Sequence, residues 1–317
     1  MGKGMLDFNT PPLMFAAWPG MGDVGLTAME YIRRGVDARL FAELDMGPFY
    51  SPEEVVVHKG LASFPEIPKS FFMEQHNPDL VFFESTMQLG GTEAITVAEA
   101  VLDVARKIKA PRIFTAAAFP YPMSYKAPSR VFAAANRQKF LRELSLFGIE
   151  PMPEGFISGL NGVLLGIAAS QDIEAACILA TIPSYASGLL YPKGSLEIIK
   201  ALSKIADLDV DTSEIEEQTR AYDETYEDIE ERLRQVFPSM IEGDEELGLE
   251  QPFELKEQQG DDERVPEMVM NRIERLFREV AQSKNRERAK ELKAELDRWG
   301  IFDLYEKRFL DLFKEEE

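Results

Sequence analysis

One stretch decides the fold of this 317-residue chain: Leu160-Asn161-Gly162-Val163-Leu164-Leu165-Gly166, followed by Ile182-Pro183-Ser184-Tyr185 and Tyr191-Pro192-Lys193-Gly194-Ser195. From Asn161 to Ser170, small and aliphatic residues recur at helical spacing. The glycines at 159 and 162 lack a Cβ atom and allow another part of the backbone to approach closely. We therefore expect a helix that packs tightly on a sheet.

Short apolar runs and amphipathic segments alternate on both sides of that stretch, which favours an α/β fold with helices on both faces of a sheet. The predicted buried strands are Leu13–Trp18, Leu80–Phe83, Arg112–Ala118 and Ala175–Ala180, with a further candidate at Glu53–Val57 and a loop at Gly60–Pro68. The predicted helices are Gly25–Arg34, Thr92–Lys109, Val131–Phe147 and Ser195–Ile205.

The C-terminal third is strongly acidic before it becomes amphipathic. Ser213 and Glu216 fit a capping box at the start of a helix that runs to Arg234. Residues 211–263 contain 20 acidic and 4 basic residues. We predict an α/β domain over residues 1–236, an acidic linker over 237–265 and a helical extension over 266–317. Apolar residues that predict an interface on this extension include Leu276, Phe277, Trp299 and Phe302.

The overall charge restricts the classes of partner. A formal net charge of −21 opposes attachment to nucleic acid or to anionic lipid. Apolar stretches are interrupted well before the ~20 residues that a membrane span requires, and no secretory signal is evident. The lone cysteine, Cys177, fits a reducing compartment and has the apolar neighbours of an inert core thiol. We expect a soluble, cytoplasmic protein.

Three places could bind a small ligand. The turn Trp18–Gly25 follows a predicted strand and precedes a helix, where amides can bind an anion, although Asp23 would repel phosphate and a structural turn is the alternative. Glu84 and Ser85 end a buried strand, and either an acid/base role or a simple capping network fits them. Lys193 could bind an anion or only begin a helix. The candidate ligand-binding residues are Gly20, Gly22, Asp23, Gly25, Glu84, Ser85 and Lys193.

No reaction has a direct signature in the sequence. His58 and His76 have no metal-ligand spacing with the cysteine, and no serine occupies a nucleophile elbow. We therefore assign no catalytic residue, metal or cofactor. Tyrosines in proline-containing loops could anchor a subunit interface or pack inside the protein. These tyrosines are Tyr121, Tyr185 and Tyr191.

The glycine turn, the Gly159–Gly162 run and the two proline–tyrosine loops occur in an order that resembles the PAC2 family, over roughly Leu13 to Arg234. This family includes proteasome assembly chaperones. The resemblance implies a nucleoside-phosphorylase-like three-layer α/β sandwich and assembly through protein interfaces. Some relatives are also labelled ATP-grasp or carboxylate-amine ligase-like, but the sequence lacks convincing nucleotide-binding machinery.

Archaeal proteasome-binding relatives can end in a hydrophobic–tyrosine–any-residue motif. This sequence ends Leu312-Phe313-Lys314-Glu315-Glu316-Glu317, and its Leu304-Tyr305-Glu306 is internal. We do not expect docking to a proteasome by that route. The favoured hypothesis is a noncatalytic, homo-oligomeric assembly chaperone or scaffold with a protein client. The alternative is a small-molecule enzyme or ligand sensor with a nucleoside-phosphorylase-like fold.

Overall fold

The computed structural model describes residues 8–52 and 55–236, and a set of helical positions between 273 and 305. The chain divides into two compact units, Met1–Phe253 and Glu254–Glu317. The predicted linker over 237–265 lies outside the described residues, so the boundaries at 236 and 266 stay predictions.

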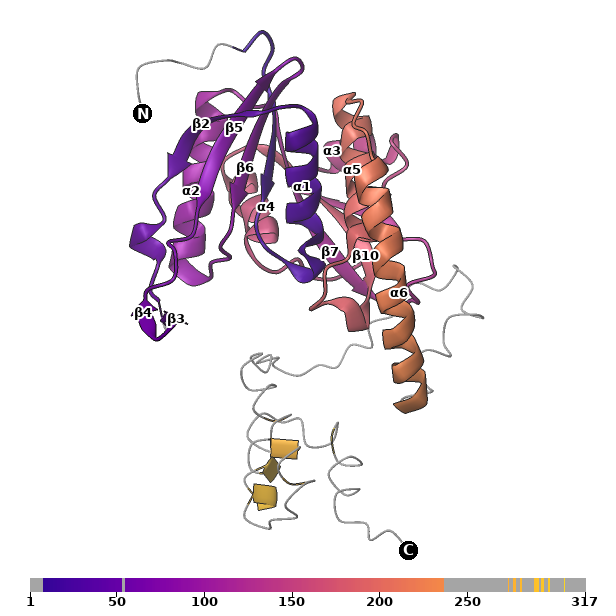
Figure 1. Ribbon diagram of the computed structural model, residues 1–317. Helices are drawn as coiled ribbons and strands as arrows, with labels where there is room; N and C mark the ends of the chain where they lie inside the picture. The colour runs from indigo at the N-terminus through magenta and orange to yellow at the C-terminus, as the bar shows by residue number, and fades with distance from the viewer. Residues whose placement is uncertain are drawn as a thin grey trace, which may run out of the picture. The chain divides into compact units, whose positions relative to one another are not determined.

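An eight-stranded sheet forms the centre of the first unit (Figure 1), in the order β2-β5-β6-β1-β7-β10-β8-β9. Its four middle strands are parallel and contain the four predicted buried runs. In register, Ala16 of β1 lies between Phe83 of β6 and Thr115 of β7. The α/β prediction is confirmed. These strands are β1 (Leu13–Ala17), β6 (Asp79–Ser85), β7 (Arg112–Tyr121) and β10 (Glu174–Pro183).

The outer strands are where the sequence-based prediction was wrong. The predicted helix Val131–Phe147 is divided into β8 (Val131–Ala135) and α3 (Gln138–Ser145). Alanine favours helix, but β8 pairs with β10 on one side and β9 (Glu150–Pro151) on the other, and this tertiary pairing overrides the local preference. Two strands on the opposite edge were not predicted at all, β2 (Arg39–Leu44) and β5 (Ser70–His76).

Helices cover both faces of the sheet (Figure 1), and alternation along β1 shows how. Phe15 and Ala17 belong to one apolar cluster with α1, α3 and α5. Met14 and Ala16 belong to the other cluster, with α2 and α4. This is the expected three-layer arrangement. The newly introduced helices are α1 (Val24–Gly35), α2 (Gly91–Lys107), α4 (Leu160–Ser170) and α5 (Pro192–Ala206).

The long helix α6 (Ser213–Val236) packs on α5. The predicted Ser213 cap is displaced, because the hydroxyl and amide of Ser213 both donate to the Asp211 carboxylate, at 2.6 and 3.0 Å. The hydroxyl of Thr212 donates to Glu216 at 2.9 Å. The polar groups that begin this helix therefore lie one to two residues before the predicted position.

A separate two-stranded ribbon follows β2. It consists of β3 (Val56–His58) and β4 (Leu61–Ser63), so the prediction of a loop from Gly60 onward was wrong over β4. Lys59 and Gly60 both have positive φ angles, 51° and 82°. Two such residues form the tight turn whose twist matches that of a hairpin, and this turn fixes the register of the ribbon.

In the second unit, the described residues are helical and seven of them form a buried apolar cluster. Leu276 and Phe277 are members of this cluster, with exposed fractions of 4% and 2%, so burial in the cluster accounts for their apolar spacing. Trp299 and Phe302 lie outside the described residues. The cluster members are Ile273, Leu276, Phe277, Val280, Ala289, Leu292 and Leu296, with Tyr305 packed beside them.

The two glycines of α4 offer a matched test of close packing. A Cβ atom at Gly162 would lie 2.2 Å from the carbonyl oxygen of Ile157, whereas one at Gly166 would meet nothing within 4 Å. Gly162→Ala should destabilise the first unit by about 1–3 kcal/mol because of this overlap. Gly166→Ala should stabilise it by about 0.5–1 kcal/mol, since alanine loses less backbone freedom in a helix. Chemical denaturation of both variants measures this, and a similar shift for the two would contradict the packing argument.

Candidate functional site

The glycine turn after β1 is bonded to the loop that precedes α5. Gly22, at φ 64°, donates its amide to the carbonyl of Ser187 at 3.2 Å, and its own carbonyl accepts from the amide of Tyr191 at 3.0 Å. Gly25 serves packing, since a Cβ atom there would lie 2.1 Å from the carbonyl oxygen of Ala116. These contacts engage the amide of Gly22 and support the structural interpretation of the turn.

Two amide side chains close the edge of the sheet at the carboxyl end of β1. The buried Asn161 accepts from the amide of Trp18 and donates to its carbonyl, both at 3.2 Å. Gln88 donates to the carbonyl of Pro19 at 2.8 Å and accepts from the amide of Leu160 at 3.1 Å. In open α/β sheets, this edge is where small ligands usually bind. Here the side chains of the protein itself hold the loop after β1 against the start of α4.

Glu84 and Ser85 are also engaged by neighbours. Glu84 is 4% exposed and accepts from Nε of Arg33 at 2.8 Å. Burial raises the pKa of Glu84, and Arg33 opposes that shift. The hydroxyl of Ser85 accepts from that of Ser70 at 2.8 Å and from the amide of Met87 at 3.2 Å. In these contacts Glu84 pairs with an arginine of α1, and Ser85 joins β6 to β5 and to the loop that follows β6.

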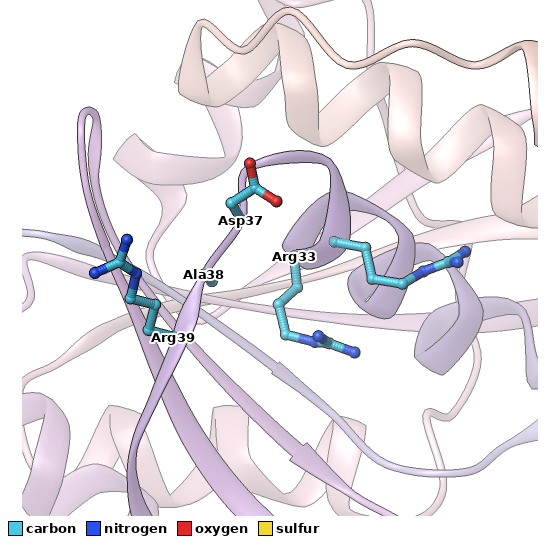
Figure 2. Close-up of a pocket in the computed structure, with 5 residues that line it drawn as sticks. Arg33, Asp37, Ala38 and Arg39 are labelled. Carbon is cyan, nitrogen blue, oxygen red and sulfur yellow. The ribbon is translucent and has the colours of Figure 1, made fainter.

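An open hollow of about 570 Å³ lies where α1 ends and β2 begins. Figure 2 shows Asp37 and Ala38 between Arg33 and Arg39. The charges around the hollow are balanced, because Arg33 pairs with Glu84 and Arg34 lies 3.8 Å from a Glu214 carboxylate oxygen. The hollow therefore has no strong excess of positive charge with which to hold an anion. Its lining residues are Arg33, Arg34, Asp37, Ala38 and Arg39.

A buried carboxylate anchors α6 to the rest of the first unit. Glu230 is 2% exposed and accepts three hydrogen bonds from two different loops. Its donors are the hydroxyl of Tyr185 at 2.6 Å, the amide of Tyr125 at 2.7 Å and the hydroxyl of Ser124 at 2.9 Å. The loop after β7 and the loop after β10 therefore meet at one side chain of α6.

Tyrosine rings surround this anchor. The ring of Tyr226 lies 5.3 Å from that of Tyr191 and 6.3 Å from that of Tyr125, and its hydroxyl donates to the carbonyl of Leu190. Burial raises the pKa of Tyr226 to about 12 and raises the pKa values of Tyr185 and Tyr191 as well. These phenols are therefore neutral at ordinary pH. The hydroxyls of Tyr185 and Tyr226 donate hydrogen bonds, and the ring of Tyr191 packs against that of Tyr226.

The structure thus brings together three of the predicted residues, Tyr185, Tyr191 and Lys193. The ammonium of Lys193 donates to the carbonyl of Tyr125 and lies 3.3 Å from the Asp223 carboxylate. Tyr121 is apart from this group at the end of β7, where it is 38% exposed. Sequence reasoning missed Tyr125, Tyr226 and Glu230. The available signal was the spacing of 222, 226 and 230, which places Tyr222, Tyr226 and Glu230 on one helix face.

Cys177 is fully buried, and burial raises the pKa of its thiol to about 12, as expected for an inert core thiol. Within residues 8–52, 55–236 and the described part of the second unit, no group of three His, Cys, Asp or Glu could hold a metal ion. Over the same residues, no helix is both long enough and apolar enough to cross a membrane.

The anchor can be tested with two glutamates of the same helix. Glu230→Ala removes the acceptor of three partly or fully buried donors, and each unsatisfied buried donor costs about 1–3 kcal/mol. We expect the first unit to lose at least about 2 kcal/mol of unfolding free energy. Glu227→Ala removes an exposed carboxylate that lies 3.2 Å from Lys126 and should cost less than about 0.5 kcal/mol. Urea denaturation distinguishes them, and equal losses would show that Glu230 is no anchor.

Comparisons with known proteins identify a matching family and similar structures. The PAC2 family model matches residues 14–230. None of the curated proteins has a sequence that matches this chain. PbaB of Pyrococcus furiosus, an archaeal proteasome activator, is 23% identical over 69% of this chain and 93% of its own, with a TM-score of 0.59.

Two further solved structures are similar. PbaA of Pyrococcus furiosus, an archaeal homolog of proteasome-assembly chaperone, is 18% identical over 74% of this chain and 94% of its own, with a TM-score of 0.58. A PAC2 family protein from Streptomyces avermitilis is 18% identical over 73% of this chain and 98% of its own, also with a TM-score of 0.58. The ATP-grasp and ligase labels find no support in these comparisons. Because the family model matches more than half of the sequence, this chain belongs to the PAC2 family.

Proposed function

We propose that this protein is a noncatalytic assembly chaperone or scaffold that acts in the cytoplasm as a homo-oligomer and binds a protein client through its surface. Membership of the PAC2 family supports this proposal. So do the structural relatives, since PbaA is a homolog of a proteasome-assembly chaperone and PbaB is a proteasome activator. Proteasome subunits are therefore the first client class to test.

The observation that carries the proposal is the closed edge of the sheet. Asn161 and Gln88 use their side-chain amides to join the loop after β1 to the start of α4. A small substrate would have to displace these bonds and would leave buried polar groups unpaired, which is costly. An enzyme of this architecture normally keeps that crevice open for its ligand.

Apolar side chains are exposed on the segments that these hydrogen bonds hold together. Leu189 and Leu190, in the loop bonded to Gly22, are 40% and 46% exposed. Met21 precedes Gly22 and is 37% exposed, while Val163, in the first turn of α4, is 38% exposed. Exposed apolar side chains are a common feature of protein interaction sites. We call these four residues the apolar rim.

The test is capture of a client by the full-length chain. Proteasome α-type subunits from the source cells are mixed with the protein, and complexes are weighed by native mass spectrometry. Leu189→Asp on the apolar rim should weaken capture at least about tenfold, because it places a charge in a desolvated contact. The control is Leu146→Asp, at an 84% exposed position that follows α3, and it should leave capture unchanged.

Two results would contradict the proposal. One is a stoichiometric nucleoside or nucleotide on the purified protein, with turnover that Asn161→Ala alters. The other is client capture that neither aspartate variant changes, which would move the binding surface away from the apolar rim.

A further inference from the structure

The β3–β4 ribbon has one face that consists entirely of apolar side chains. Val57 and Ala62 are cross-strand partners. The alternation along each strand, continued one residue pair beyond the ends of the strands, places Val55 and Phe64 on the same face. All four residues are exposed, with Val57 at 63% and Phe64 at 71%. The opposite face is mixed, because Val56 and Leu61 share it with His58 and Ser63. We call the first face the ribbon face.

Such a ribbon needs a partner. Two strands alone are marginally stable in water, and an exposed apolar face gains free energy when another surface covers it. The Lys59–Gly60 turn holds the register, so the four side chains of the ribbon face stay on one side. The ribbon therefore presents these four side chains together.

We propose that the ribbon face pairs with the ribbon face of a second copy of this chain, with the two ribbons antiparallel about a two-fold axis. Opposite charges at the two ends of the ribbon favour a second copy of this chain as the partner. Lys59 is exposed at the tip of the ribbon, residues 55–65 contain no acidic residue, and Glu66 is exposed at the base. In the antiparallel arrangement, each Lys59 lies against the partner's Glu66, so the attraction occurs twice in one dimer.

The absence of acidic residues from the ribbon also reduces the electrostatic repulsion between two copies. Two copies that each carry a net charge of −21 repel each other, and this repulsion is weakest between segments that lack acidic residues. Residues 55–65 form such a segment. This inference concerns self-association and does not depend on the identity or existence of a client.

Neighbouring valines on opposite faces give the first test. Val57→Lys places a charge on the ribbon face, and Val56→Lys places the same charge on the mixed face, at a residue that is 50% exposed. In sedimentation velocity of the full-length protein over a concentration series, Val57→Lys should raise the self-dissociation constant at least about tenfold. Val56→Lys should change it by less than about threefold. Thermal melts check that both variants keep the fold.

A charge exchange tests whether the occupant is a second copy. Lys59→Glu alone and Glu66→Lys alone each replace two attractions by two repulsions in their own dimers. When the two variants are mixed, a heterodimer restores both attractions, so the mixture should regain the wild-type mass distribution.

A monomeric wild type at all concentrations, equal effects of the two valine variants, or a mixture that does not recover would each overturn the proposal. Loss of client capture with an unchanged mass would instead count against the assembly role alone. A monomeric wild type would also remove the homo-oligomer from the proposed function, whereas failure of the valine or charge-exchange test would leave that function in place.

Discussion

The structure depends on the buried side-chain amide of Asn161, which forms the two hydrogen bonds that the backbone of a neighbouring strand would form. Asn161 offers its side-chain oxygen and nitrogen to the amide and carbonyl of Trp18, and its own carbonyl accepts from the Thr115 hydroxyl at 2.6 Å. The side chain thus pairs with β1 where no further strand residue is available. Since all these groups are buried, their pairing is needed to avoid a large desolvation cost. The first turn of α4 is fixed to the two central strands by this contact.

Two glycines permit close backbone contacts of α4 and α1. Gly162 lets α4 lie against the Ile157 carbonyl, and Gly25 lets α1 lie against the Ala116 carbonyl. The Gly25 contact brings α1 onto β7, and the Gly162 contact holds the start of α4 against the loop that precedes it.

Sequence patterns predicted secondary structure correctly where the local preference of a segment agrees with its place in the fold. The four central strands are continuous apolar runs, buried on both faces, and these produce a clear signal. β8 was mistaken for helix because Val131-Phe132-Ala133-Ala134-Ala135 has no strand-specific alternation, and its state is decided by pairing with β10. β2, at the edge, and β5, between β2 and β6, were missed because each mixes polar and apolar residues. The candidate ligand residues stand in local motifs, but their partners are distant in sequence and follow no local rule. These partners are Ser187 for Gly22, Arg33 for Glu84 and Asp223 for Lys193.

The hydrogen bonds of Glu230 also affect the order in which parts of the first unit can fold during synthesis. Its hydrogen-bond donors lie at 124, 125 and 185, so the tyrosine cluster is present early in synthesis while its acceptor is made last among them. Until α6 has left the ribosome, Tyr125, Tyr185 and Tyr191 have no helix to cover them. A nascent chain of this protein therefore exposes an aromatic surface for the time needed to make the segment up to Glu230, and it closes that surface itself.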